Sequence, residues 1–145
     1  MRKSNPQGYA NLLSRVMESS EEMGEQVDPH FQDFKKAITL KGIESLGNRE
    51  LHETVLAFKK AVDLYQKNAV SLKNAKPPVQ VLGRHKQLVA AYQKYAADCA
   101  LMLQSVDEDK HSVNADQFSK AEQAQDKDMD LVSKSFDRIM ALLMR

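Results

Sequence analysis

Apolar residues recur at helical spacing through most of the chain, and the clearest run lies within residues 48–75. Asn48, directly after Gly47, has a side chain that can cap a first helical turn. Pro77 and Pro78 lack amide protons, so a helix must end before them. The positions between step alternately by four and three, which places them on one helix face: Leu51, Val55, Phe58, Val62, Tyr65, Ala69 and Leu72.

The same spacing predicts a second helix over about 79–107. Its face consists of Val81, His85, Leu88, Tyr92, Tyr95, Cys99, Met102 and Val106. The next residues, 107–111, are Asp-Glu-Asp-Lys-His and form a polar break. Ser112 or Asn114 can then cap another helix.

A further helix is predicted from about 115 to 143. Its face is clearest in the second half, at Met129, Val132, Phe136, Ile139 and Leu143. Phe118 and Ala121 begin the face more weakly, and Gln125 and Asp126 make its middle polar. We therefore expect this helix to pack well at its C-terminal end and more loosely at its start.

The N-terminal third keeps a helical phase across the dipeptide Asp28-Pro29. The apolar positions are Tyr9, Leu12, Val16, Met23, Val27, Phe31, Phe34 and Ile38. Either one helix kinks at Pro29, or it breaks there and restarts with Asp28 as the N-cap and Pro29 in the first turn. The break is the favoured prediction. Gly42 and Gly47 then bracket a short turn.

Three to four long helices with short connections predict an all-α, up-and-down antiparallel bundle formed by a single domain over residues 1–145. No stretch alternates with a period of two, so no strand is expected. Gly and Pro are scarce, at five and four of 145 residues, which agrees with helix. The first few residues are expected to be disordered.

Composition narrows the functional classes. The net charge of +1 argues against a general polyanion binder, and no specific nucleic-acid binding is expected. Residues 48–106 are basic, with nine Lys/Arg against four Asp/Glu, which leaves a polyanion-binding hairpin as a third hypothesis. No apolar run is long enough for a transmembrane segment. We expect a soluble protein that is cytoplasmic as the chain stands, or in the cell envelope or secreted if a leader has been removed.

Two groups of residues could be reactive sites, but a structural role explains each of them better. The lone cysteine, Cys99, lies among alanines on an apolar face and is expected to be a buried small hydrophobe. Glu108 and His111 have the Glu-x-x-His spacing of di-iron bundles, but such sites need two copies in the core. We expect a solvated connection there, no dedicated metal site and no cofactor. The alternative is adventitious binding of a divalent ion by Asp107, Glu108, Asp109 and His111.

One cluster is a candidate ligand site. Tyr65, Tyr92 and Tyr95 could line a pocket between helices together with His85. The alternative is that the tyrosines are core aromatics with wetted hydroxyls, and that His85 is an edge residue whose nitrogen reaches water or a carbonyl.

Part of the chain, roughly residues 65–95, resembles small uncharacterised helical-bundle proteins of Gram-positive bacteria. The resemblance rests on a Lys-x-x-x-x-Pro junction, which is Lys73 to Pro78 here, followed by a histidine with Leu and Tyr at helical spacing: His85, Leu88, Tyr92 and Tyr95. It implies a helical bundle and an envelope-associated setting, since several such proteins are lipoproteins. This sequence shows no lipid-attachment cysteine. The family has no established activity, so the resemblance implies no catalytic residue.

The sequence therefore predicts no enzyme. The leading hypothesis is a non-catalytic helical interaction or scaffold module, with a protein partner or a second copy of the chain. The alternative is a small-molecule-binding bundle with a pocket lined by Tyr65, His85, Tyr92 and Tyr95.

Overall fold

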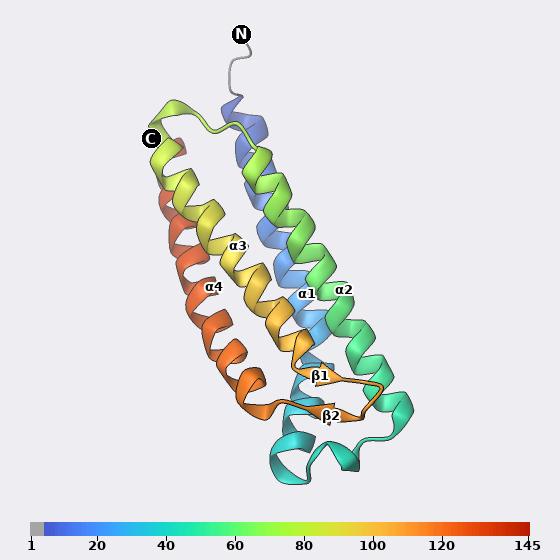
Figure 1. Ribbon diagram of the computed structural model, residues 1–145. Helices are drawn as coiled ribbons and strands as arrows, with labels where there is room; N and C mark the ends of the chain where they lie inside the picture. Colours follow the sequence, from blue (N-terminus) through green and yellow to red (C-terminus); the bar gives the residue numbers. More distant parts are fainter. Residues whose placement is uncertain (1–4) are drawn as a thin grey trace.

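Four long helices run alternately up and down in the computed structural model, which describes residues 5–145 (Figure 1). They are α1 (Pro6–Leu40), α2 (Asn48–Asn74), α3 (Leu82–Gln104) and α4 (Ala115–Leu143). α1 begins and α4 ends at the same end of the bundle. The predicted all-α bundle is confirmed, while the expected disorder of the first few residues falls on positions 1–4, outside the described part.

α1 is continuous through Pro29, so the predicted break at Asp28-Pro29 is wrong. Proline removes one helical hydrogen bond, here the one that the carbonyl of Glu25 would accept. Pro29 and Glu25 are both exposed, so water can satisfy that carbonyl. The helix then continues because it places Phe34 in the core, where its side chain is only 1% exposed.

The first two connections are short turns. A 3₁₀ turn, η1 (Ile43–Ser45), follows Gly42, whose φ of 87° favours glycine. α2 begins one residue earlier than predicted, so Gly47 is its N-cap and the side chain of Asn48 does not cap it. The proline pair ends α2 as predicted, and a second 3₁₀ turn, η2 (Val79–Val81), precedes α3.

The third connection is a small hairpin that the sequence did not predict. β1 (Val106–Asp107) pairs antiparallel with β2 (Ser112–Val113), and the polar break lies between them. His111 adopts a positive φ of 51° in this turn. The side chain of Asn114 then accepts a hydrogen bond from the backbone amide of Gln117, which confirms the predicted cap of α4.

The buried apolar residues form two clusters along the bundle. The terminal core lies toward the start of α1 and includes Tyr9, Leu13, Leu72, Leu88, Tyr92 and Ile139. The hairpin core lies toward the β-hairpin and includes Phe34, Leu51, Val55, Phe58, Met102, Phe118 and Ala121. Because Phe118 and Ala121 are buried, the expected loose packing at the start of α4 is wrong. The polar residues in the middle of α4 lie where the two cores meet.

No helix within residues 5–145 has both the length and the apolar character that crossing a membrane requires.

Candidate ligand-binding cavity

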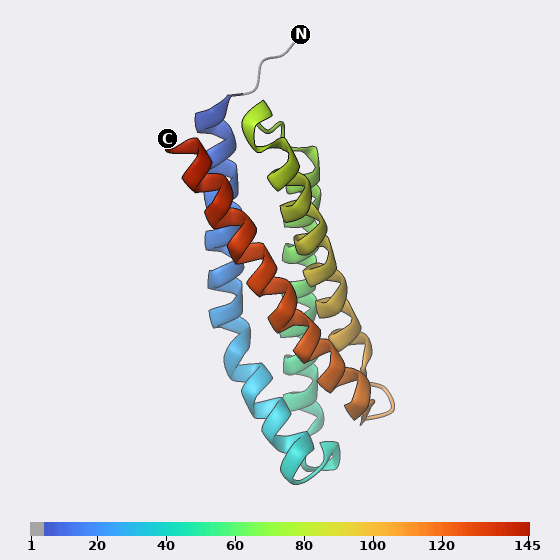
Figure 2. The same ribbon diagram turned by 90° about the vertical axis from the view of Figure 1, so that its left-hand side faces the viewer.

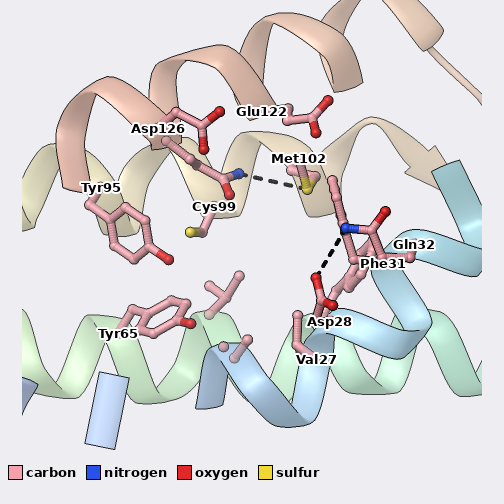
Figure 3. A pocket seen from close by; sticks show the side chains of 15 residues that line it. Val27, Asp28, Phe31, Gln32, Tyr65, Tyr95, Cys99, Met102, Glu122 and Asp126 are labelled. Atoms are coloured by element: carbon pink, nitrogen blue, oxygen red, sulfur yellow. Dashed lines mark hydrogen bonds between the residues drawn. The ribbon is translucent and has the colours of Figure 1, made fainter. Parts of the chain in front are cut away.

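A cavity of about 300 Å³ lies at the junction of the two cores (Figure 3). All four helices contribute to its lining. α1 and α4 lie close together near the terminal end and diverge toward the hairpin (Figure 2). The cavity occupies this diverging part of the bundle, and residues of α2 and α3 complete its lining.

The inner wall of the cavity is apolar and aromatic. Tyr65 on α2 and Tyr95 on α3 meet edge to face with ring centroids 5.0 Å apart. Cys99 and Met102 continue the wall along α3, and Phe58 does so on α2. Tyr65, Cys99, Met102 and Phe58 are buried, whereas Tyr95 is half-buried because it faces the cavity.

The outer rim of the cavity is acidic. Asp28 on α1 and Glu122 and Asp126 on α4 lie on the two helices that diverge. The ammonium group of Lys35 lies 2.8 Å from a carboxylate oxygen of Glu122, which joins α1 to α4. The same ammonium group lies 5.8 Å from the ring centroid of Phe31, another lining residue.

Burial makes the phenol and thiol groups of the inner wall harder to ionise. Desolvation raises the pKa of Tyr65 to about 12, and it also raises the pKa of Tyr95. The pKa of the Cys99 thiol is raised by burial to about 12 as well, so at neutral pH Cys99 is a thiol and not a thiolate nucleophile. The prediction that Cys99 is a buried small residue is confirmed.

Tyr92, which the sequence grouped with these tyrosines, does not line the cavity. Its ring centroid lies 6.0 Å from that of Tyr95, but the side chain is fully buried in the terminal core. Its hydroxyl oxygen lies 2.7 Å from that of Ser20 and accepts a hydrogen bond of 3.0 Å from the side-chain amide of Asn68. Tyr92 therefore joins α1, α2 and α3.

His85 also lies outside the cavity lining. It is 5% exposed rather than at the edge of the bundle, and its Nδ1 lies 2.8 Å from the hydroxyl oxygen of Tyr9. Desolvation lowers its pKa, and a backbone hydrogen bond with Leu72 opposes this effect more weakly. The structure thus brings Tyr65 and Tyr95 into one site and leaves Tyr92 and His85 outside its lining.

Glu108 and His111, the Glu-x-x-His pair of the connection, hydrogen-bond to two different neighbours. Glu108 accepts a hydrogen bond of 2.7 Å from Nδ1 of His52 on α2. Nε2 of His111 instead donates to the carbonyl oxygen of Ile43, at 3.1 Å. Within residues 5–145, no group of three or more acidic, histidine or cysteine side chains is arranged to hold a metal ion.

Two buried carboxyl groups were missed by the sequence reasoning. Asp98 and Asp128 face each other across α3 and α4, and Lys94 contacts both, with Nζ–O distances of 2.8 Å and 3.4 Å. One carboxyl oxygen of Asp128 is buried without a hydrogen-bond partner. The signal in the sequence was weak, since Lys94 and Asp98 show only the common four-residue spacing of surface ion pairs.

The acidic rim did leave a signal in the sequence. Gln125 and Asp126 interrupt the apolar face of α4, and both line the cavity. Both residues of this polar interruption line the cavity, whereas only two of the three tyrosines do, so the interruption predicted the lining better.

Searches with the whole chain find no matching family model, no matching curated protein and no matching solved structure. The resemblance to helical-bundle proteins of Gram-positive bacteria therefore stays a prediction.

Proposed function

We propose that this protein is a non-catalytic binding bundle that takes a small organic cation with an aromatic or apolar body into the cavity between its four helices. The observation that carries the proposal is the division of the lining into two parts. The inner wall is formed by uncharged aromatic, aliphatic and sulfur-containing side chains, and the rim by carboxylates. A ligand with an apolar body and a cationic end matches both parts.

The size of the cavity limits the ligand. A volume of about 300 Å³ is at the small end of ligand pockets. It equals the volume of about ten water molecules, so the ligand has on the order of ten non-hydrogen atoms.

The charge of the rim selects a cation. Among the described residues, Asp28 and Asp126 form no ion pair, whereas Glu122 is neutralised by Lys35. Asp28 accepts a hydrogen bond of 3.2 Å from Nε2 of Gln32, which leaves its charge in place. The negative charge of Asp28 and Asp126 therefore remains available to an ammonium group. The rings of Tyr65 and Tyr95 give the apolar body of the ligand an aromatic surface to pack against.

Binding can be measured by isothermal titration calorimetry with three probes of similar size: phenethylamine, phenylethanol and phenylacetate. We expect phenethylamine to bind more tightly than the neutral alcohol, and phenylacetate to bind most weakly. Equal affinity for the amine and the carboxylate would contradict the proposal.

Variants test whether the cavity is the site. The double variant Asp28→Asn/Asp126→Asn should weaken phenethylamine binding by about tenfold or more, since one charge pair near a protein surface contributes more than 1 kcal/mol at about 4 Å. The matched control is Asp116→Asn/Asp130→Asn, which removes two exposed carboxylates of α4 that do not line the cavity. The proposal fails if both double variants bind the amine equally well.

The interaction-module hypothesis has less support. Five leucines are exposed, and apart from Leu82 at the start of α3 they lie on four different helices: Leu40, Leu56, Leu101 and Leu131. Singly exposed apolar side chains are ordinary on protein surfaces and mark no particular interface.

A further inference from the structure

The two ends of the bundle carry opposite net charge. The sequence does not show this directly, because each end is built from segments that are far apart in the chain. The level of Ser20, Asn68 and Tyr92, which contact one another, divides the bundle across its length. Toward the start of α1 lie residues 5–20, 68–92 and 132–145, here called the terminal half. The remaining described residues, 21–67 and 93–131, form the hairpin half (Figure 1).

The terminal half is strongly basic. It holds eight Lys/Arg against two Asp/Glu, whereas the hairpin half holds eleven against eighteen. The net charge of +1 thus hides two oppositely charged ends. The basic segment 48–106 noted in the sequence is divided between them, because α2 and α3 each run the length of the bundle.

Three arginines of the terminal half surround one hollow. Arg84 in the first turn of α3 and Arg138 and Arg145 at the end of α4 line a depression of about 210 Å³ together with Ala141 and Leu142. All three arginines are exposed, and none forms an ion pair within the described residues. No acidic side chain occupies the first turn of α3. Guanidinium groups grouped in this way suit a phosphate, which they can bind through several donors.

The same end carries exposed apolar side chains. Val79, in the turn before α3, is 88% exposed, and Met144, after the end of α4, is 81% exposed. Leu82, in the first turn of α3, is 44% exposed. The tip of the bundle therefore combines cations with apolar side chains that stay exposed among residues 5–145.

From this combination we infer that the terminal half docks end-on onto an anionic phospholipid surface, with Arg84, Arg138 and Arg145 holding a lipid phosphate and Val79, Leu82 and Met144 entering the interface. The basic charge complements the anionic headgroups, and the apolar side chains match the boundary between headgroups and acyl chains. The phosphates of a nucleic acid would contact only the arginines, because a nucleic-acid backbone has no apolar layer into which Val79 and Met144 could insert. The acidic hairpin half faces away from the lipid. This inference is independent of the proposed function, since none of these residues lines the cavity.

The first test is co-sedimentation with vesicles of phosphatidylcholine alone and of three parts phosphatidylcholine to one part phosphatidylglycerol. We expect binding to the anionic vesicles only. Binding should weaken between about 0.1 M and about 1 M salt, as the Debye length falls from about 10 Å to about 3 Å. Absence of binding to anionic vesicles at about 0.1 M salt, or binding to duplex DNA in its place, would overturn the inference.

Charge variants locate the contact. Arg84→Gln/Arg138→Gln should lower partitioning onto anionic vesicles about thirtyfold, which corresponds to about 1 kcal/mol for each cation near the surface. The control Lys59→Gln/Lys60→Gln removes the same charge from two exposed lysines of the hairpin half and should change partitioning far less. Equal losses in the two double variants would show attraction by net charge alone and would overturn the assignment of the terminal half.

A fluorescent probe tests the orientation directly. Cys99 is buried and its thiol pKa is about 12, so it competes weakly for a thiol-reactive dye. An environment-sensitive dye on Val79→Cys should shift to the blue when anionic vesicles are added, which shows transfer to an apolar medium. The same dye on Leu40→Cys, at the opposite end of α1, should not shift. A shift at residue 40 without one at residue 79 would reverse the inferred orientation and overturn the inference.

Discussion

The hydroxyl oxygen of Tyr9, near the start of α1, lies 2.8 Å from Nδ1 of His85, near the start of α3. Both side chains are buried, and their rings pack edge to face with centroids 5.4 Å apart. Burial raises the pKa of Tyr9 to about 12, so its hydroxyl keeps the proton and donates a hydrogen bond to Nδ1 of His85. The pair thus joins two helices at the terminal end through a neutral imidazole.

Tyr9→Phe should lower the free energy of unfolding by about 1–3 kcal/mol, because it leaves Nδ1 of His85 buried without a donor. Urea denaturation measures this change. The control is a double-mutant cycle with His85→Leu, in which Tyr9→Phe should cost much less since the acceptor is already absent. Equal costs of Tyr9→Phe in the two backgrounds would show that the hydrogen bond does not stabilise the fold.

His85 should make the fold sensitive to acid. Burial lowers its pKa below the ordinary 6.5 in the folded state, so the unfolded chain takes up the proton first. The contribution of His85 to stability is therefore present above about pH 6.5 and is lost as the pH falls below it. The midpoint of urea denaturation is measured at pH values about one unit apart, from about pH 7.5 down to about pH 5. It should fall with pH in the wild type and fall less steeply in His85→Leu. Parallel pH profiles would contradict this assignment.

Asp128→Asn should stabilise the protein at neutral pH. Burial, together with the neighbouring Asp98, raises the pKa of Asp128 to about 6, so its ionisation opposes folding. Burial acts the same way on Asp98, but hydrogen bonds from Asp128 and Lys94 outweigh it and lower the pKa of Asp98. As the pH rises from the ordinary value of 3.8 toward 6, the wild type loses stability through Asp128, and the variant does not.

We expect Asp128→Asn to raise the free energy of unfolding by about 1–3 kcal/mol above about pH 6, since a pKa shift of one unit corresponds to about 1.4 kcal/mol. Near about pH 4 the variant and the wild type should differ little. Denaturation at the two pH values measures it. The control Asp130→Asn replaces an exposed carboxylate two residues away and should change stability little at either pH. A destabilised Asp128→Asn at neutral pH would show that the ionised form is required by Lys94.

Pro29→Ala should raise the free energy of unfolding by up to about 3 kcal/mol, because alanine restores the missing hydrogen bond within a continuous helix. Thermal unfolding followed by circular dichroism measures it. Pro6→Ala is the matched control, since Pro6 begins α1 and no helical bond is missing there. An unchanged or lower midpoint for Pro29→Ala would show that the helix depends on the proline conformation at this position.

The periodicity of the chain determined the helices and the class of fold. The boundaries of α2 and α4 follow closely from local signals, namely the proline pair after α2 and Asn114 before α4. Such signals act over a few residues, so they are readable in the sequence. The break at Pro29 was predicted wrongly because the local cost of proline competes with burial of Phe34, and burial depends on what the other helices place opposite it.

The tertiary structure alone decided the site and its charges. Tyr65, Tyr92 and Tyr95 share helical spacing, but only the packing places Tyr92 against Ser20 and the other two against a cavity. The partner of His85 is Tyr9, which lies 76 residues away in the chain. The composition determined a nearly neutral protein, whereas antiparallel packing placed most acidic residues in the hairpin half and left the terminal half with a net positive charge. Spacing along a helix determines which face a residue occupies, and only the assembled bundle determines what that face meets.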